Sequence, residues 1–482
     1  MSVVKRIAKN TFVMIFGQIV SKILSLIFVI YAARYLQAEG FGVLSFALAF
    51  AGMFGIFSDI GFYELTVREV ARNKQLASKY VGNILVFKIL LITVVFGLMC
   101  LAINIMGYPY QTIKIVYIIG LAIVFDAFSM ISNAVFQAFE KLEYITVGSV
   151  LRGLLLPVGA LIVIHNKWGI TAFAYLYLLA SFVVLIYSIT LTIKKFTKPN
   201  FEIDVDFWKL LLKEGSPFWA SAVLTTIFYN IDKVMLSMIV GNEAVGFYSA
   251  AYRLIASLNI IPLAFIASIF PVTSQLYVSS NETLKFAFER SFKYMLILGI
   301  FTGVLITLLS ERIIIFIYGK GYTPSITILQ ILIWAEAIFF INSTIRNLLE
   351  SINKQVIITY LMVLGVTSNV VMNWLLIPMY SYIGASFATV ATRLFVFLLH
   401  FAWVMKSGYR LSNETLMSAI KIIAFLLAIW VLFCLFNLNA YLFAAVFVGT
   451  FLSTLHILKI IDETDKKLIK NAISFFRMAK GD

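Results

Sequence analysis

The chain consists largely of apolar runs, each about as long as the α-helix that crosses a lipid bilayer. A bilayer core requires about 20 apolar residues per helix, and by this rule the sequence contains about fourteen spans. Because backbone N–H and C=O groups find no water inside a bilayer, such runs form helices. The sequence therefore predicts an all-α polytopic membrane protein. The predicted spans are residues 11–35, 41–61, 81–106, 114–136, 145–164, 171–193, 216–240, 247–276, 287–309, 326–344, 357–378, 384–405, 415–436 and 440–460.

The composition agrees with this prediction. Hydrophobic residues make up 62% of the 482 residues and charged residues 13%, whereas a soluble domain has about 25% charged residues. Lipid must therefore cover most of the surface. In a soluble protein the net charge of +15 would suggest a nucleic-acid partner. Here the positions of the charges carry more information than their sum, and we expect no nucleic-acid partner.

Lysine and arginine gather in the loops on one side of the predicted membrane. These loops run from the N-terminal Lys5, Arg6 and Lys9 to the tail between Lys459 and Lys480, whereas the opposite loops hold only Arg34, Lys114, Lys167, Arg312 and Lys320. Cytoplasmic loops carry an excess of basic residues. We therefore expect a multi-pass protein of the cytoplasmic (plasma) membrane with both termini cytoplasmic, as an even number of spans requires.

One short stretch of the sequence occurs twice. The letters YLQAEGFGVLSFALAF around Glu39 match IVGNEAVGFYSAAYRL around Glu243, and Gly42 matches Gly246 at the same separation of 204 residues. Both copies lie where one apolar run ends and the next begins. We interpret the stretch as a duplicated membrane hairpin. It predicts two six-helix lobes related by a pseudo-twofold axis along the membrane normal, which face each other across a cleft.

The repeat divides the chain into five predicted parts. Residues 1–195 form an N-terminal six-helix lobe, 196–214 a cytoplasmic linker and 215–405 a C-terminal six-helix lobe. Residues 406–461 form two additional helices that have no counterpart in the repeat. Residues 462–482 place apolar side chains at helical spacing among basic ones, which indicates a cytoplasmic amphipathic tail on an anionic leaflet. The alternative for this tail is a frayed, solvated end.

Ionisable residues inside the spans form the candidate site. Each costs at least ~2.5–3.5 kcal/mol to insert, so by default it faces a bundle interior or a wet cavity. The cations are Lys22, Lys88, Arg152, Lys233, Arg253 and Arg393, and the acids are Asp59, Asp126, Asp232 and Glu336. The excess of cations predicts a cavity that attracts an anionic ligand, because lysine and the arginine fork both suit phosphate.

These residues also have structural interpretations. The cations nearest the membrane surface can snorkel towards it, and Arg253 can anchor the outer rim. Asp59 can pair with the region around Arg68, and Asp232 can pair with Lys22 or Arg253. The acids can also serve a coupling Na⁺ or H⁺ rather than a structural ion pair.

Several classes of function are excluded by missing motifs. Cys100 and Cys434 lie inside apolar runs, and the three histidines His165, His400 and His456 are isolated, so no metal site or disulfide framework is expected. The sequence also lacks a GxxxxGK[ST] nucleotide loop, a nucleophile elbow and a zinc motif. We therefore expect no cofactor, no metal, no direct use of ATP and no enzymatic activity.

Four segments of the sequence resemble a known family. They are KRIAKNTFVMIFGQIVSKILSLIFVIYAARYLQAEGFGVLSFALAF (residues 5–50), SDIGF (58–62), REVARNK (68–74) and GSPFWASAVLTTIFYNIDKVMLSMIVGNEAVGFYSAAYRL (215–254). They are similar to polysaccharide-biosynthesis flippases of the Wzx type, within the multidrug/oligosaccharidyl-lipid/polysaccharide (MOP) exporter superfamily. The resemblance implies two six-helix lobes in a V shape and a polyprenyl-pyrophosphate-linked sugar as substrate. It also implies cavity cations in the first and eighth spans, which here are Lys22 and Arg253 by position.

The resemblance and the excess of cations favour a flippase for lipid-linked oligosaccharide units. It would move them from the cytoplasmic to the outer leaflet by alternating access, powered by an ion gradient or the membrane potential. Expected partners are the polyprenyl-pyrophosphate-linked sugar, Na⁺ or H⁺, the lipid bilayer, and a polymerase and other envelope-polysaccharide proteins. The alternative is a cation-coupled exporter of small molecules, like the multidrug and toxin extrusion (MATE) transporters, which requires an acidic cavity for cationic drugs. A membrane sugar-chain polymerase or ligase is less favoured, because no outer loop is large enough to carry catalytic residues.

Overall fold

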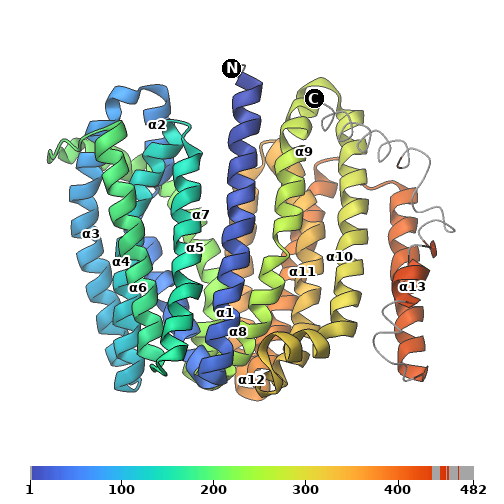
Figure 1. The fold of residues 1–482 in the computed structure, drawn as a ribbon. Coiled ribbons are helices and arrows are strands. Elements are labelled where there is room, and N and C mark those ends of the chain that lie inside the picture. The colour runs from blue at the N-terminus through green and yellow to red at the C-terminus, as the bar shows by residue number, and fades with distance from the viewer. Residues whose placement is uncertain (1–2, 437–445, 452, 455–464, 466–482) are drawn as a thin grey trace. The chain divides into compact units, whose positions relative to one another are not determined.

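The computed structural model describes residues 3–436, 446–451, 453, 454 and 465, and every regular element among them is a helix (Figure 1). Ten helical segments of this part are long and apolar enough to cross a membrane. The prediction of an all-α polytopic membrane protein is thus confirmed. The predicted fourteenth span (440–460) and the predicted tail (462–482) fall largely outside the described residues. The helices are α1 (Val3–Gly55), α2 (Phe62–Arg72), α3 (Ala77–Ile105), α4 (Tyr110–Ala138), α5 (Leu142–His165), α6 (Ile170–Leu191), α7 (Val205–Ile239), α8 (Asn242–Ser257), α9 (Ile260–Ser279), α10 (Asn281–Tyr318), α11 (Pro324–Ser351), α12 (Gln355–Lys406) and α13 (Asn413–Phe436).

Two of these helices contain a kink at which the chain turns back. Helix α1 has 53 residues, which in a straight helix would span about 80 Å, far more than the ~30 Å of a bilayer core. The backbone leaves the helical region at Gln37 (φ 57°), and in α12 it does so at Ser381 (φ 53°). Figure 1 shows the start of α1 and helix α2 at the same end of the molecule. The two kinks fall between the predicted spans 11–35 and 41–61 and between 357–378 and 384–405.

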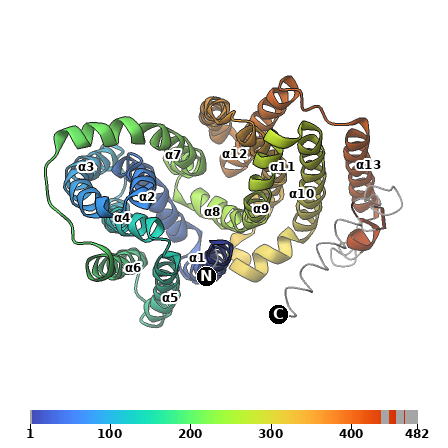
Figure 2. The same ribbon diagram turned by 90° about the horizontal axis from the view of Figure 1, so that it is seen from above.

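The chain forms two compact units, and each combines separate stretches of sequence. The first contains the described residues of 1–257, 314–328 and 362–392, and the second those of 258–313, 329–361 and 393–482. Within the first unit, α1 packs against α4, α5 and α8. Seen from above, α4 lies between α3 and α6 (Figure 2). Within the second unit, apolar side chains of α10, α11 and α12 such as Phe288, Leu348 and Val404 form a buried core.

The passage between the units falls at a break in the predicted span 247–276. Helix α8 ends at Ser257 and α9 begins at Ile260, and the boundary between the units lies after Ser257. Pro262 follows in the first turn of α9. Proline is tolerated there, but it cannot continue a preceding helix because it has no N–H group and its ring clashes with the carbonyl four residues earlier. Pro262 therefore coincides with a real interruption of this span.

The two copies of the repeated stretch contact each other inside the first unit. A Cβ atom on Gly42 would lie 1.7 Å from the backbone oxygen of Asn242, and one on Gly246 would lie 1.9 Å from the backbone oxygen of Ala38. The offset of 204 residues maps Gly42 onto Gly246 and Ala38 onto Asn242, so the two close contacts are equivalent. Only glycine lets the backbones of α1 and α8 approach this closely.

We expect Gly42→Ala to destabilise the protein, because the added methyl group meets backbone rather than a movable side chain. Overpacking of this kind costs about 1–3 kcal/mol, and a backbone clash lies at the upper end of that range. Gly52→Ala is the matched control on the same helix, since no atom lies within 4 Å of its Cβ position. That substitution should be neutral or slightly stabilising, because glycine weakens a helix interior. The thermal unfolding of both purified variants tests this difference, and equal midpoints would contradict it.

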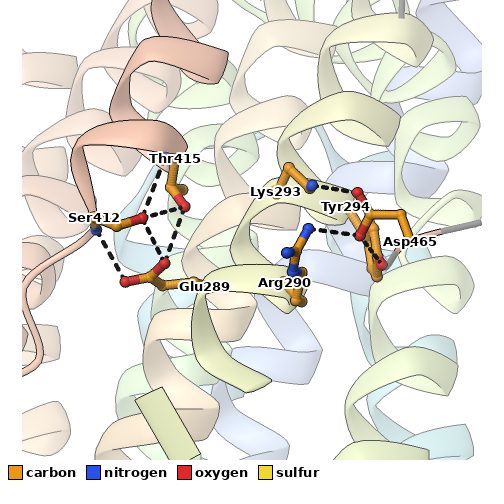
Figure 3. A network of polar contacts seen from close by, with 7 residues as sticks. All are labelled: Glu289, Arg290, Lys293, Tyr294, Ser412, Thr415 and Asp465. Atoms are coloured by element: carbon orange, nitrogen blue, oxygen red, sulfur yellow. Dashed lines mark hydrogen bonds and ion pairs between the residues drawn. The ribbon is translucent and has the colours of Figure 1, made fainter. Parts of the chain in front are cut away.

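In the second unit, α10 holds the start of α13 through one carboxylate (Figure 3). Glu289 accepts hydrogen bonds from the backbone N–H of Ser412 (2.9 Å), from the Ser412 hydroxyl (2.7 Å) and from the Thr415 hydroxyl (3.1 Å). These bonds occupy polar groups at the N-terminus of α13, where N–H groups otherwise lack partners. The additional helix α13 is therefore joined to α10 by polar contacts.

Three neighbouring side chains of α10 converge on Asp465, a residue from the C-terminal part of the chain (Figure 3). Arg290 donates a hydrogen bond to its carboxylate over 2.8 Å and the Tyr294 hydroxyl donates one over 2.6 Å, while Lys293 forms an ion pair with the second oxygen. Asp465 is fully buried. Its negative charge is matched by two cations, as a buried carboxylate requires.

Candidate functional site

Two of the predicted intramembrane residues form a dry ion pair at the start of α2. Lys88 of α3 is fully buried, and its Nζ donates to Asp59 Oδ2 and to the backbone oxygen of Ala127, both over 2.9 Å. Asp59 Oδ1 accepts the backbone N–H groups of Phe62 (2.8 Å) and Tyr63 (3.3 Å) and so caps α2. Both carboxylate oxygens are occupied, and the Lys88 ammonium does not snorkel.

The expectation that Asp59 pairs with the region around Arg68 is therefore wrong. Arg68 lies further along α2 and instead forms ion pairs with Glu69 and with Glu214 of α7. The physical reason is the cap, because Asp59 holds the first turn of α2 while Arg68 projects from a later turn. Lys88, from another helix, reaches the free side of the carboxylate.

A second dry pair lies in the second unit. Arg393 of α12 donates through Nη1 to Glu336 Oε2 of α11 over 3.0 Å and to the backbone oxygen of Ala335 over 3.1 Å. Both charged side chains are buried. The predicted cation Arg393 is thus neutralised by the predicted acid Glu336.

A third pair differs because it lines a pocket. Arg152 of α5 binds Asp126 of α4 through both guanidinium Nη groups, one of them 2.9 Å from Asp126 Oδ2, and Arg152 also donates to the Ser181 hydroxyl over 3.3 Å. The pocket has a volume of about 540 Å³ and lies among α1, α4, α5 and α6 in the first unit. Its lining also includes Lys22, mid-way along the first arm of α1. Lys22, Arg152 and Asp126 are therefore brought together.

Three predicted cations have no carboxylate within ion-pair distance among the described residues. These are Lys22, Lys233 and Arg253. The Nζ atom of Lys233 in α7 lies 4.8 Å from the centre of the Tyr252 ring. It also donates a hydrogen bond to the backbone oxygen of Tyr229 over 3.4 Å. Arg253 of α8 follows Tyr252, and Arg253 and Asp232 both act electrostatically on Lys233. All three belong to the first unit, so this unit retains uncompensated positive charge in membrane-spanning helices.

Among the described residues, Asp232 is the one predicted acid whose side-chain hydrogen bonds all come from neutral side chains. Its Oδ2 accepts hydrogen bonds from the Tyr248 hydroxyl (2.6 Å) and the Thr389 hydroxyl (2.8 Å), and its Oδ1 accepts one from the Asn373 amide (2.6 Å). Asp232 is buried, and the Asn373 side-chain oxygen beside it is a buried atom without a hydrogen-bond partner. Of the alternatives for Asp232, pairing with Lys22 or Arg253 is not what the described residues show, because these three neutral donors satisfy its carboxylate.

The hydrogen-bond partners of Asp232 could not be predicted from the sequence, because none of them is charged. Tyr248 belongs to α8, whereas Asn373 and Thr389 come from the two arms of α12, more than 130 residues away in the chain. One signal was present, since Asn369 and Asn373 lie four residues apart and share a face of a helix. Asn373 donates to the Asn369 side-chain oxygen over 3.1 Å.

Taken together, the fold and its charged interior define a multi-pass helical membrane protein, and comparison with known proteins gives its family. A family model described as "Polysaccharide biosynthesis protein" matches residues 7–277, and a model described as "MatE" matches residues 217–375. The first match covers more than half of the chain. The chain therefore belongs to the polysaccharide biosynthesis protein family, which confirms the resemblance stated from its sequence.

Relatives and solved structures agree with this assignment. The chain is 25% identical over 275 residues to an uncharacterized membrane protein of Methanocaldococcus jannaschii, a match that covers 55% of this chain and about half (54%) of that protein. It is 24% identical over 352 residues to a putative O-antigen transporter of Shigella flexneri, which covers 70% of this chain and 82% of that one. The structure of a lipid II flippase, MurJ, in an inward closed conformation superposes with a TM-score of 0.74 at 17% identity, over 95% of this chain and all of that one. The chain is a membrane transporter of the MOP superfamily and not an enzyme.

Proposed function

We propose that the protein is a flippase that moves polyprenyl-pyrophosphate-linked oligosaccharide units from the cytoplasmic to the outer leaflet of the cytoplasmic membrane, with both termini cytoplasmic. The observation that carries this proposal is the set of three cations, Lys22, Lys233 and Arg253, that form no ion pair with a carboxylate among the described residues. The family and the similarity to a putative O-antigen transporter support the class of substrate.

In this proposal the pyrophosphate binds the uncompensated cations and the sugar follows it. Uncompensated charge in a membrane-spanning bundle attracts an opposite charge strongly, because low dielectric weakens screening. The guanidinium of Arg253 offers a fork of donors for phosphate, and the lysines add compact charges. The prenyl chain stays in lipid. Rocking of residues 1–195 against 215–405 then exposes the head group on the outer side.

We further propose that Asp232 binds the coupling ion, Na⁺ or H⁺. A proton on its carboxylate, or a sodium ion held by oxygen atoms, would neutralise the one acid of the predicted set that forms no ion pair with a described residue. The unpartnered oxygen of Asn373 supports an oxygen-rich ion site, since hard cations prefer oxygen ligands.

A second candidate function, a MATE-like exporter of small molecules, is favoured by the MatE match to residues 217–375.

Flipping of a fluorescent polyprenyl-pyrophosphate sugar in proteoliposomes tests the proposal. We expect gradient-driven movement in the wild type and a fall of at least about tenfold in Lys22→Ala and in Arg253→Ala, because loss of one charged phosphate contact removes ~2–5 kcal/mol of binding. Lys209→Ala is the control, since Lys209 lies in an exposed ion pair with Asp206. Wild-type rates in both cavity variants would contradict the cation site. Transport of cationic dyes in place of the lipid-linked sugar would favour the exporter.

A further inference from the structure

The three intramembrane ion pairs differ in their access to solvent. The side chains of Lys88 and Asp59 are 0% and 11% exposed, and those of Arg393 and Glu336 are 6% and 1% exposed. In contrast, the side chains of Arg152 and Asp126 are 34% and 31% exposed, because both line the pocket among α1, α4, α5 and α6. This pair is open to a ligand, whereas the other two are not.

The pocket has the size and chemistry of a binding site. Its volume of about 540 Å³ lies within the ~300–1,000 Å³ typical of ligand sites. Two cations and one acid line it, so it carries net positive charge. Hydroxyl and amide groups surround them, among them those of Gln18, Ser21, Asn133 and Ser149, and the Ser21 hydroxyl oxygen is a buried atom without a hydrogen-bond partner.

Asp126 is anchored by fewer kinds of contact than Asp59 and Asp232. Asp59 also caps α2, and Asp232 accepts bonds from α8 and from both arms of α12. Within the described part of the chain, Asp126 accepts hydrogen bonds only from Arg152. Arg152 keeps a further contact with the Ser181 hydroxyl. If this ion pair opened, Arg152 would keep its contact with Ser181, whereas Asp126 would keep no hydrogen bond from the described residues.

A carboxylate and a phosphate bind a guanidinium in the same way, each through two parallel N–H···O bonds. We propose that this pocket is a phosphate subsite and that Asp126 is an exchangeable anion within it. The phosphate of the substrate displaces Asp126 from Arg152 and binds Lys22 at the same time. Asp126 returns to Arg152 when the phosphate leaves. This inference rests on the proposed flippase function and adds a device for releasing the substrate.

The exchange predicts opposite effects on binding and on transport. Asp126→Asn keeps the size of the side chain but removes the competing charge, so pyrophosphate should bind about tenfold more tightly. Flipping should become slower, because no internal anion helps the phosphate to leave. A purely structural ion pair would give weaker binding and slower flipping together. Asp206→Asn, in the exposed pair with Lys209, is the control and should leave the affinity unchanged.

The affinity is measured by calorimetric titration of geranyl pyrophosphate, and in parallel of inorganic pyrophosphate, into the full chain in phosphatidylcholine nanodiscs. Flipping rates come from proteoliposomes made with the same protein. We expect Asp126→Asn to bind both probes more tightly than the wild type. Because inorganic pyrophosphate has no isoprenoid chain, such a result would assign the gain in affinity to the phosphate groups. Unchanged or weaker binding in Asp126→Asn, or a gain with geranyl pyrophosphate alone, would overturn the inference.

A second variant covers the case in which Asp126→Asn does not fold. Arg152→Lys keeps the charge and the attraction to Asp126 but removes the bidentate fork, so pyrophosphate should bind about tenfold more weakly. Unchanged affinity in this variant would also overturn the inference. The two proposals fail separately. A wild-type chain that flips lipid-linked sugar without the Asp126 effect retains the flippase function, whereas a wild-type chain that flips none loses it.

Discussion

Asp232→Asn is expected to abolish ion-gradient-driven flipping while substrate binding persists. Asparagine keeps the size of the side chain and one hydrogen-bond acceptor for Tyr248 or Thr389, but it can neither take up a proton nor supply charge to a sodium ion. An ion shifts a conformational equilibrium only through its different affinities for the two states. Without the carboxylate this difference disappears, and the flipping rate should fall at least about tenfold, to the rate without a gradient.

The measurement compares flipping in proteoliposomes with and without a sodium or proton gradient, together with binding of geranyl pyrophosphate to the same protein. Asp206→Asn is the matched control, since Asp206 lies in the first turn of the same helix and its side chain is exposed. If Asp232→Asn still responds to a gradient at the wild-type rate, the coupling ion binds elsewhere. If it loses substrate binding as well, Asp232 supports the substrate site instead.

Lys88→Met is expected to cause the largest loss of stability. It leaves Asp59 without its cation and the backbone oxygen of Ala127 without its donor, both in the interior of the first unit. Breaking a buried ion pair from one side typically costs ~3–5 kcal/mol, because the remaining charge has no compensation. The loss is measured as the free energy of unfolding in mixed micelles.

The double variant Lys88→Met with Asp59→Asn should recover most of that loss. It removes both charges, and asparagine can still cap α2 through the N–H groups of Phe62 and Tyr63. Lys209→Met, which breaks the exposed pair with Asp206, should change stability by less than about 1 kcal/mol. A double variant as unstable as Lys88→Met alone would show that packing of the lysine stem, and not the unpaired charge, maintains this region.

The hairpins were predictable because hydrophobic length and glycine spacing are local properties of the sequence. The kink at Gln37 lies inside the stretch that the sequence repeats, and the equivalent position in the second copy, Gly241, also has a positive φ (121°). Helix α7 begins at Val205, earlier than the predicted span at 216, because Asp204 caps it with a hydrogen bond from the Phe207 N–H. That extension is amphipathic and so carried no hydropathy signal.

The choice of ion-pair partners was not predictable, because it depends on how helices rotate about their axes. Lys88 and Asp59 are 29 residues apart in the chain and Arg393 and Glu336 are 57 apart. The residues were identified as intramembrane charges, but their pairing follows from tertiary packing. Tyr248, Asn373 and Thr389 were missed for the same reason. A neutral polar side chain in an apolar span does not stand out in the sequence, and its role becomes visible only when the fold places a buried carboxylate beside it.

The contact between Gly42 and Gly246 has the form of a homodimer interface. In a twofold interface, residue i of one copy meets residue j of the other, and j meets i in return. Here Gly42 meets Asn242, and Gly246 meets Ala38, which are the same pair exchanged between the copies. A chain consisting of one half would therefore present a surface complementary to itself. When two such halves are joined in one chain, the contact between two molecules becomes a contact within one molecule. Its formation then no longer depends on protein concentration.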